Sequence, residues 1–339
     1  MMSKWEAFEY QTGDETKILR LFREVFGFER SLEHWKWEFL DSPAGRGITY
    51  LAKAEDRVVG QYTVVPVEMV VRGRTVMGAQ SVDTMTANDF RRQGIFEQLA
   101  KLTLKAAREL GVEIIYGFPN QNSYPGLVGK LDFLSVAPVG KFRQRLDWKR
   151  LAVDKHPKSI VKSVAKEYFK SLRATEKSIK GLERCQRFTE EHDDLWKRVS
   201  KSVGLCVAKT SSYLNWRYCK RPNSTYRILQ IRDYDLIVGV AIWNQDGINA
   251  TFVDMIADSE TVAKRLKYAV VREARKRGCK FLQGWELCRE GRQGSMFRDS
   301  PLVAEPWVLV AISPTRTFAK QDLSIEAGWQ IHMGDSDGI

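Results

Sequence analysis

An internal repeat constrains the fold of this chain more than any other feature, because a repeated sequence pattern predicts a repeated structural unit. Three pairs of identical residues lie 179 positions apart: Trp37 and Trp216, Pro43 and Pro222, and Gly60 and Gly239. Val82-Asp83 corresponds to Val253-Asp254 at an offset of 171, as if the second copy had lost part of a hairpin. Residues 107–111 correspond to 274–278 at an offset of 167. Since the matches keep one order along the chain, we predict a duplicated domain.

The length of 339 residues exceeds the usual size of one domain, which agrees with a duplication. We predict a first domain at residues 1–145, a basic helical linker at 146–190 and a second, related domain at 191–339. Helix, antiparallel meander, helix and strand follow one another in the first copy, a pattern typical of the α+β class. The expected architecture is therefore two tandem α+β domains, each with a mixed, mostly antiparallel sheet flanked by helices.

Apolar patterning in the first copy predicts two hairpins and a helix. The strands are expected at residues 51–54 and 58–65, with a turn at Glu55-Asp56, and at 67–71 and 75–85, around Arg72-Gly73-Arg74. A helix is predicted from about Gly94 to Gly111, where glycine provides a C-terminal cap. A short buried strand is expected at residues 114–118.

Composition indicates a soluble protein of the cytoplasm. Hydrophobic residues make up 43% of the chain, yet the longest apolar run, Leu236 to Trp243, is far shorter than a membrane span of about 20 residues. The first residues lack the apolar core of a signal peptide. The 5 cysteines form no C-x-x-C pair, which is typical of reduced thiols. His34, His156, His192 and His332 show no metal-ligand spacing, so we expect no metal.

Most of the net charge of +12 belongs to one segment. Between Lys141 and Arg187, fifteen Lys or Arg stand against five Asp or Glu, a net charge of +10. Apolar side chains from Ile160 to Leu172 recur at helical spacing among lysines, which predicts a basic amphipathic helix. The simpler interpretation is a helix that packs its apolar stripe on one domain; the alternative is contact with an anionic membrane face or an acidic partner through residues 141–187.

The loop at residues 86–96 has the features of an anion site. It lies between a predicted strand and a strong helix that begins near Gly94. The free backbone N–H groups and the positive dipole end of such a helix attract anions. Arg91 and Arg92 add positive charge where a phosphate would lie. The alternative is a solvent-exposed turn with an incidental arginine pair.

This loop resembles the acyl-CoA signature of the GNAT superfamily, Q/R-x-x-G-x-G/A. Arg91 occupies the first position and Gly94 the first glycine, whereas Phe96 stands where glycine or alanine is usual. The resemblance implies acetyl-CoA or another acyl-CoA as co-substrate. It also implies that Arg91, Arg92, Gln93, Gly94, Ile95 and Phe96 hold the phosphates. The ring of Phe96 departs from the pattern and bears on the size of the acyl chain.

A second segment of the first copy is also similar to the family. Asn120 and Tyr124 follow the strand at 114–118, in the region where the family has Asn-x-x-Ala and then a tyrosine. Val128 occupies the place of that tyrosine and Asp132 replaces a glycine. The resemblance covers residues 1–145 well and residues 190–335 as a weaker second copy.

The second copy lacks the loop. Its counterpart at residues 255–262 has no Arg-x-x-Gly and carries Asp258 and Glu260, whose charges would repel a pyrophosphate. We expect this domain to shape the acceptor pocket or to stabilise the first domain. Residues 329–337 are expected to form a last strand with an acidic tail.

The resemblance implies direct acyl transfer from CoA to a small-molecule amine in a ternary complex. The pantetheine would pair with the strand backbone near Met85 and Thr86, where an N–H would polarise the thioester carbonyl. Tyr124 is the candidate acid and Asp83 the candidate base, although Asp254 stands at the same place in a copy without the loop. The alternative bases are Asp335, Asp337 and the C-terminal carboxylate, if the tail folds over the first site.

Two other functions fit the same sequence. A Fem-like aminoacyl or peptidyl transferase also pairs two GNAT-like domains, and its tRNA donor would suit the basic segment. Such enzymes do not need the Arg-x-x-Gly loop, whose presence favours CoA. The second alternative is a non-catalytic module that binds CoA or a partner.

Overall fold

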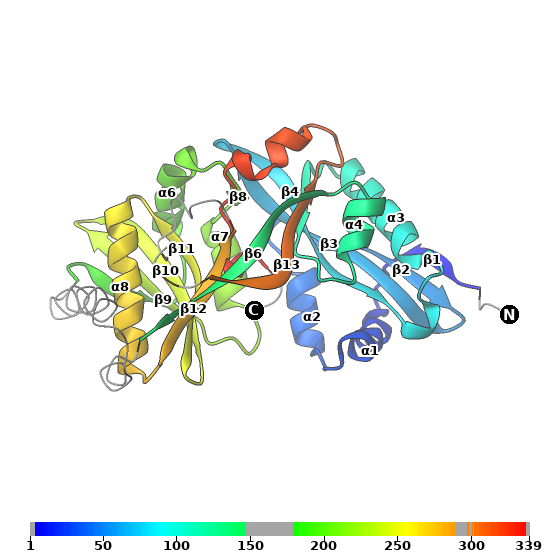
Figure 1. Ribbon diagram of the computed structural model, residues 1–339, viewed down its shortest axis with the longest axis horizontal. Helices are drawn as coiled ribbons and strands as arrows, with labels where there is room; N and C mark the ends of the chain where they lie inside the picture. Colours follow the sequence, from blue (N-terminus) through cyan, green and yellow to red (C-terminus); the bar gives the residue numbers. More distant parts are fainter. Residues whose placement is uncertain (1–3, 147–178, 289–296, 298–299, 301, 337–339) are drawn as a thin grey trace, which may run out of the picture.

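The computed structural model describes residues 4–146, 179–288, 297, 300 and 302–336 (Figure 1). In the first half of the chain the strands and helices are β1 (Glu6–Glu9), α1 (Glu15–Phe26), α2 (Leu32–Phe39), β2 (Ile48–Ala54), β3 (Arg57–Val71), β4 (Arg74–Thr86), α3 (Ile95–Glu109), β5 (Ile114–Gly117), α4 (Tyr124–Lys130) and β6 (Leu134–Arg145). The predicted basic helix at residues 160–172 lies outside the described residues.

The second half has a similar, but not identical, succession of elements. Its strands and helices are β7 (Leu182–Cys185), α6 (Glu190–Val199), β8 (Leu205–Val207), α7 (Ser211–Leu214), the π-helix η3 (Asn215–Cys219), β9 (Arg227–Asp233), β10 (Leu236–Asp246), β11 (Asn249–Ala257), α8 (Glu260–Lys276), β12 (Phe281–Leu287) and β13 (Leu302–Ile312). Short 3₁₀ helices then follow at Lys320–Leu323, Ile325–Ala327 and Met333–Asp335.

The described strands form one mixed sheet of 13 strands rather than one sheet per domain. Their order is β1-β2-β3-β4-β5-β13-β6-β12-β11-β10-β9-β7, with β8 paired to β3. The parallel pairs β4–β5 and β11–β12 lie on either side of the centre, and the other pairings are antiparallel. Strand β13 from the second half pairs with β5, and β6 from the first half pairs with β12. The expectation of a separate sheet in each half is therefore wrong.

The strands and the helix predicted for the first copy are confirmed with one correction. The turn at Glu55-Asp56 and the helix that ends before Gly111 lie where the pattern places them. Residues 58–71, however, belong to a single strand, β3, instead of two. Proline is tolerated at position 66 because the pairing of β3 with β2 stops at Val64.

Helices cover both faces of the first half of the sheet (Figure 1). The buried residues of α3 recur at helical spacing and include Ile95 and Leu99, which lie against Gly60 of β3. Helix α1 contacts β3 and β4, and with α2 it lies on the side of the sheet opposite α3 and α4. The loop between β4 and α3 starts where β4 ends, at Thr86. None of the described helices is long and apolar enough to cross a membrane.

The two tryptophans of the repeat meet at the junction of the halves. Trp37 Nε1 donates a hydrogen bond to the backbone oxygen of Trp216 at 2.8 Å, and Trp216 Nε1 donates to that of Trp37 at 2.8 Å. Their rings stack with centroids 5.1 Å apart, and both side chains are buried. Two tryptophans 179 positions apart in the sequence therefore contact each other reciprocally.

Residues 329–336 do not form the predicted last strand. Trp329 makes an isolated bridge to Leu205, and a 3₁₀ helix follows at Met333–Asp335. The backbone oxygens of Gly334 and Ser336 accept hydrogen bonds from the buried guanidinium of Arg217 instead of from a neighbouring strand. Asp337 lies outside the described residues.

Candidate active site

Strands β4 and β5 separate at the edge of the candidate site. Their parallel pairing runs from Gly78 with Ile114 to Ser81 with Gly117 and stops there. Strand β4 continues to Thr86, still paired with β3 on its other side. Among the described strands, none pairs with β4 beyond Ser81 on the side of β5. An extended ligand could use these backbone groups as a strand would.

A bulge bends β4 within this free stretch. Gln61 of β3 pairs with Met85, but Thr63 pairs with Val82, so β4 carries an extra residue between them. Asp83 lies in the bulge with a φ of 45°, a left-handed conformation that aspartate tolerates better than most residues. Met85 is buried after the bulge and Thr86 is half-buried. The backbone that is predicted to pair with the pantetheine, near Met85 and Thr86, thus belongs to the irregular part of β4.

The helix that follows the loop after β4 lacks a side-chain cap at its N-terminus. Gly94 occupies the N-cap position of α3 with a φ of 80°, and no side chain of the described residues caps the helix there. A Cβ atom built on Gly94 would have no other atom within 4 Å, so the space in front of the helix is open. Arg91 and Arg92 are exposed beside it, and Arg92 has a φ of 63°. These features fit a phosphate group.

An ion pair fastens this loop to the sheet. Asp89 accepts hydrogen bonds from both terminal nitrogens of Arg57, at 2.7 and 3.1 Å, and the pair lowers the pKa of Asp89. Arg57 also binds Glu24 of α1 at 2.9 Å. Because the anchor binds upstream of Gln93 and Gly94, it leaves the helix start free for a ligand.

Phe96 packs between the sheet and α4. Its ring lies 5.9 Å from that of Tyr62 on β3, and a Cβ atom on Gly126 of α4 would come within 2.5 Å of it. Burial raises the pKa of Tyr62 to about 12. The contact with Gly126 brings α4, which starts at Tyr124, against the first turn of α3. The structure therefore joins the loop to the element that carries the candidate acid.

Tyr124 and Asn120 have well-defined partners. Tyr124 Oη donates a hydrogen bond to Ser135 Oγ of β6 at 3.0 Å, and its side chain is half-buried. Asn120 Oδ1 accepts from the backbone N–H groups of Asn122 and Ser123, at 2.9 and 3.2 Å. Asn120 therefore stabilises the turn before α4 and thereby positions Tyr124, the first residue of that helix.

Asp83 forms a buried ion pair with Arg30, a residue that the sequence reasoning missed. Both carboxylate oxygens of Asp83 accept hydrogen bonds from Arg30, whose guanidinium also lies 3.1 Å from Glu38 and 4.1 Å from the centre of the Phe22 ring. Burial raises the pKa of Asp83, although Arg30 opposes this. These contacts give the carboxylate of Asp83 a role in holding the bulge of β4. Its assignment as the base stays a prediction.

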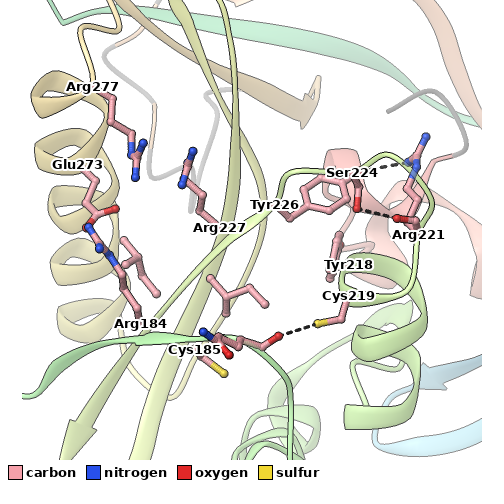
Figure 2. Close-up of a pocket in the computed structure, with 13 residues that line it drawn as sticks. Arg184, Cys185, Tyr218, Cys219, Arg221, Ser224, Tyr226, Arg227, Glu273 and Arg277 are labelled. Atoms are coloured by element: carbon pink, nitrogen blue, oxygen red, sulfur yellow. Dashed lines mark hydrogen bonds and ion pairs between the residues drawn. The ribbon is translucent and has the colours of Figure 1, made fainter.

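The corresponding helix start in the second half is closed. Ser259 caps α8, its hydroxyl accepting from the backbone N–H of Val262 at 3.3 Å. Asp258 and Glu260 flank the cap, and Glu260 pairs with Lys264 at 2.6 Å. A cavity of 410 Å³ does lie in this half (Figure 2), but none of the residues predicted for the site lines it.

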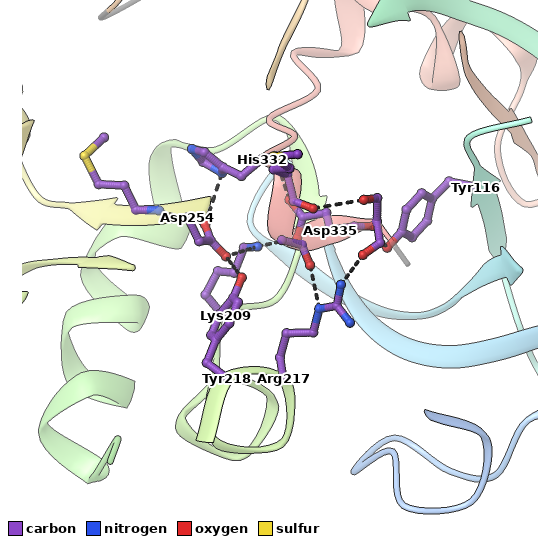
Figure 3. A network of polar contacts seen from close by, with 11 residues as sticks. Tyr116, Lys209, Arg217, Tyr218, Asp254, His332 and Asp335 are labelled. Carbon is purple, nitrogen blue, oxygen red and sulfur yellow. Dashed lines mark hydrogen bonds and ion pairs between the residues drawn. The ribbon is translucent and has the colours of Figure 1, made fainter. Parts of the chain in front are cut away.

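The C-terminal segment is buried between the halves, in a network that the sequence reasoning also missed (Figure 3). Lys209 Nζ binds Asp254 at 2.7 Å and also binds Asp335, and all three side chains are buried. Tyr116 of β5 donates to the backbone oxygen of Asp335 at 3.0 Å. Burial would raise the pKa of Asp254, but Lys209 and His332 outweigh it and lower the pKa. The tail thus reaches β5, and Asp335 is held there by a cation.

The two ion pairs occupy related positions of the sequence repeat. Arg30 and Lys209 lie 179 positions apart, the offset of the tryptophans, and each binds the aspartate of a Val-Asp pair. Among the described residues, no group of His, Cys, Asp and Glu is arranged to hold a metal ion.

Comparison with known proteins finds a family match for the first part of the chain. Residues 7–133 match the family model of the acetyltransferase (GNAT) domain. No curated protein matches the chain by sequence.

Solved structures share the fold over most of the chain. A probable N-acyltransferase of unknown function from Enterococcus faecalis V583 has a TM-score of 0.67 at 12% identity, over 92% of this chain and 73% of that one. A GCN5-related N-acetyltransferase from Anabaena variabilis gives 0.65 at 13% identity, over 92% and 73%. The N-myristoyltransferase of Saccharomyces cerevisiae with bound myristoyl-CoA gives 0.58 at 13% identity, over 92% and 80%. At these identities the likeness establishes a GNAT fold.

Proposed function

We propose that this protein is an acyltransferase that moves an acetyl or other short acyl group from CoA to an amine by direct transfer. One observation carries the proposal: the uncapped, glycine-started end of α3 lies beside the free stretch of β4, within the residues that match the GNAT domain. The structural likeness to an N-myristoyltransferase bound to myristoyl-CoA supports an acyl-CoA as the donor.

The residues present fit such a donor. The backbone N–H groups at Gly94, Ile95 and Phe96 would hold the phosphates, with Arg91, Arg92 and Gln93 around them. The free backbone at Met85 and Thr86 would pair with the pantetheine, and an N–H there would polarise the reacting carbonyl. When bound, the acyl-CoA supplies an activated thioester.

A short acyl chain is supported by Phe96. Where the family usually has glycine or alanine, this ring fills the space between Tyr62 and Gly126. A Cβ atom on Gly126 would already collide with it, so the contact leaves no spare volume between α3 and α4 at this point.

Two side chains of the first half are assigned to proton transfer and positioning. Tyr124 Oη would hold the proton that the leaving thiolate takes up, and its hydrogen bond to Ser135 fixes the hydroxyl. Asp83 remains the predicted base, and its ion pair with Arg30 keeps the bulge of β4 in place. Asp335 is the alternative base; its backbone oxygen accepts a hydrogen bond from Tyr116 of β5, and its carboxylate binds Lys209.

We also propose that the chain contains two tandem GNAT-like domains that exchange their last strands. The symmetric strand order, the reciprocal Trp37–Trp216 contact and the Arg30–Asp83 and Lys209–Asp254 ion pairs support this. In this account the domain boundaries are those expected from the sequence, with residues 191–339 as a degenerate copy that supports the first. The 5 cysteines form no C-x-x-C pair in the sequence, which supports a cytoplasmic location.

The test is an acyl-transfer assay with the full chain. Acetyl-CoA is incubated with a panel of small amines, and free thiol release is followed together with the acylated product. Amine-dependent release supports the proposal. Tight acetyl-CoA binding without turnover across the panel would favour the non-catalytic module, and transfer from aminoacyl-tRNA without CoA binding would favour the Fem-like alternative.

A further inference from the structure

The second half contains an arginine-rich cavity that the acyl transfer does not use. Its volume is 410 Å³, within the range of small-molecule sites, which is about 300–1,000 Å³. Its charged lining comprises Arg184, Arg221, Arg227, Arg277 and Glu273 (Figure 2). Strands β7 and β9 form one wall and the end of α8 another. Four cations around one carboxylate give the cavity a strongly positive character.

The single carboxylate neutralises only one of these arginines. Glu273 Oε1 accepts hydrogen bonds from Arg184 Nε at 3.1 Å and Nη2 at 2.7 Å. Arg221 donates to the hydroxyl of Tyr226 at 3.2 Å. Within the described ranges, neither Arg227 nor Arg277 forms an ion pair with a carboxylate. Two guanidinium groups thus face the cavity without a carboxylate in ion-pair contact among the described residues.

Arg227 is the more constrained of the two. Its Nε is buried and finds no hydrogen-bond partner among the described residues, which is costly for a charged group. Burial and the charge of Arg277 lower the pKa of Arg227. Figure 2 shows the two side chains reaching into the same part of the cavity, Arg227 from β9 and Arg277 from just beyond α8. Such an arrangement is stabilised by an anion placed between them.

The cavity is separate from the candidate active site. All of its lining residues lie between 184 and 277, whereas the loop and the free edge of β4 belong to residues 82–96. Strands β7 and β9 are at the opposite end of the sheet from β2, β3 and β4. A ligand here would therefore be bound in addition to acyl-CoA.

We propose that this cavity binds a small phosphorylated molecule, with its phosphate held between Arg227 and Arg277. A phosphate dianion matches two guanidinium charges, and its three terminal oxygens accept more hydrogen bonds than a carboxylate can. The cavity volume exceeds that of a phosphate group, so the organic part of the ligand occupies the rest. The site goes beyond the proposed acyl transfer and does not depend on it.

The experiment uses the full chain carrying Gly94→Glu, which removes the phosphate site at α3. Binding of phenyl phosphate, inorganic phosphate and benzoate is measured by titration calorimetry at fixed ionic strength. We expect phenyl phosphate to bind once per chain and to bind better than either inorganic phosphate or benzoate. Absence of phenyl phosphate binding, or equal binding of benzoate, would overturn the proposal.

Matched variants then locate the site. Arg277→Gln should weaken phenyl phosphate binding by about tenfold or more, because a charge-assisted contact is lost. Arg277 is exposed, so this variant should fold. Lys276→Gln removes the same charge from the neighbouring exposed residue, which does not line the cavity, and should have little effect. Equal losses in the two variants would mean non-specific attraction and would contradict the assignment. Glu273→Gln removes the competing carboxylate and should tighten binding.

Discussion

Helices α3 and α8 begin after corresponding strands of the sheet, but the first turns of the two helices differ in capping and in the charge around them. Each follows a strand of a parallel pair, β4 or β11, and packs on its own half. At α3, Gly94 leaves the first N–H groups free and two arginines stand nearby. At α8, Ser259 takes up one of these N–H groups and two acidic residues surround it. A few residues at the helix start thus distinguish an open, uncapped helix end from a closed cap on one scaffold.

The buried ion pairs show what the two halves retain. Arg30 binds Asp83 in the first half, and Lys209 binds Asp254 at the same repeat positions in the second. Since the second half keeps the pair but not the open loop, we propose that the pair supports the architecture and that the loop binds the ligand.

The largest expected effect comes from making α3 resemble α8. Gly94→Glu places a carboxylate at the open helix end, where it repels phosphate and occupies its space. We expect acetyl-CoA binding to be lost, a change on the order of several kcal/mol. Titration calorimetry measures it, with circular dichroism to verify the fold.

Gly94→Ala is the matched control. It carries the same left-handed backbone strain of about 1–2 kcal/mol without the charge, and a Cβ atom there meets nothing within 4 Å. Its affinity for acetyl-CoA should therefore remain measurable. Unchanged affinity in a folded Gly94→Glu protein would mean that the loop does not hold the phosphates.

The second prediction concerns the ion pair that both halves share. Lys209→Met leaves Asp254 and Asp335 buried without their cation, so the free energy of unfolding should fall by about 3–5 kcal/mol. Urea denaturation measures the change. Lys197→Met, which breaks the exposed pair with Asp194, should change the stability little because solvent screens that pair. Similar losses for the two variants would contradict a structural role for the buried pair.

The third prediction tests whether the first half alone supplies the chemistry. Tyr124→Phe keeps the ring and removes the hydroxyl, so kcat should fall by about 10²-fold, the lower end of general acid catalysis, because a thiolate is already a fair leaving group. Acetyl-CoA affinity should barely move. Ser135→Ala removes only the hydrogen-bond partner and should cost less. If Tyr124→Phe keeps a near wild-type kcat across the pH range, Tyr124 is not the acid and only packs against its neighbours.

The smallest effect is a pH dependence at the junction of the halves. Burial, together with Arg221, Arg30 and Arg217, lowers the pKa of His34 from 6.5 to about 4. Between these pH values the unfolded chain takes up a proton that the folded chain does not, so stability decreases as the pH falls through this window. His34→Gln should flatten the dependence, measured as the free energy of unfolding at pH 7 and pH 4.5. An identical pH dependence in the variant would exclude His34 as its source.

Local features of the first half were predictable because they depend on neighbouring residues. Apolar spacing located α3, and the Gly94 loop before it was recognisable from its own residues. The pairings that define the sheet were not predictable, since β13 meets β5 across nearly two hundred residues. Likewise Lys209, Asp254 and Asp335 meet only in the folded chain, 45 and 126 positions from the lysine. Residues 329–337 were expected to form a strand, but Arg217 binds the backbone oxygens of Gly334 and Ser336.

The stoichiometry of acetyl-CoA binding tests the contrast between α3 and α8 most directly. Titration calorimetry of the full chain should give one acetyl-CoA per chain, and Gly94→Glu should remove that binding entirely. Ser259→Gly, which uncaps α8 but leaves Asp258 and Glu260, should add no second site. Two equivalent sites per chain, or a site that survives Gly94→Glu, would contradict the account.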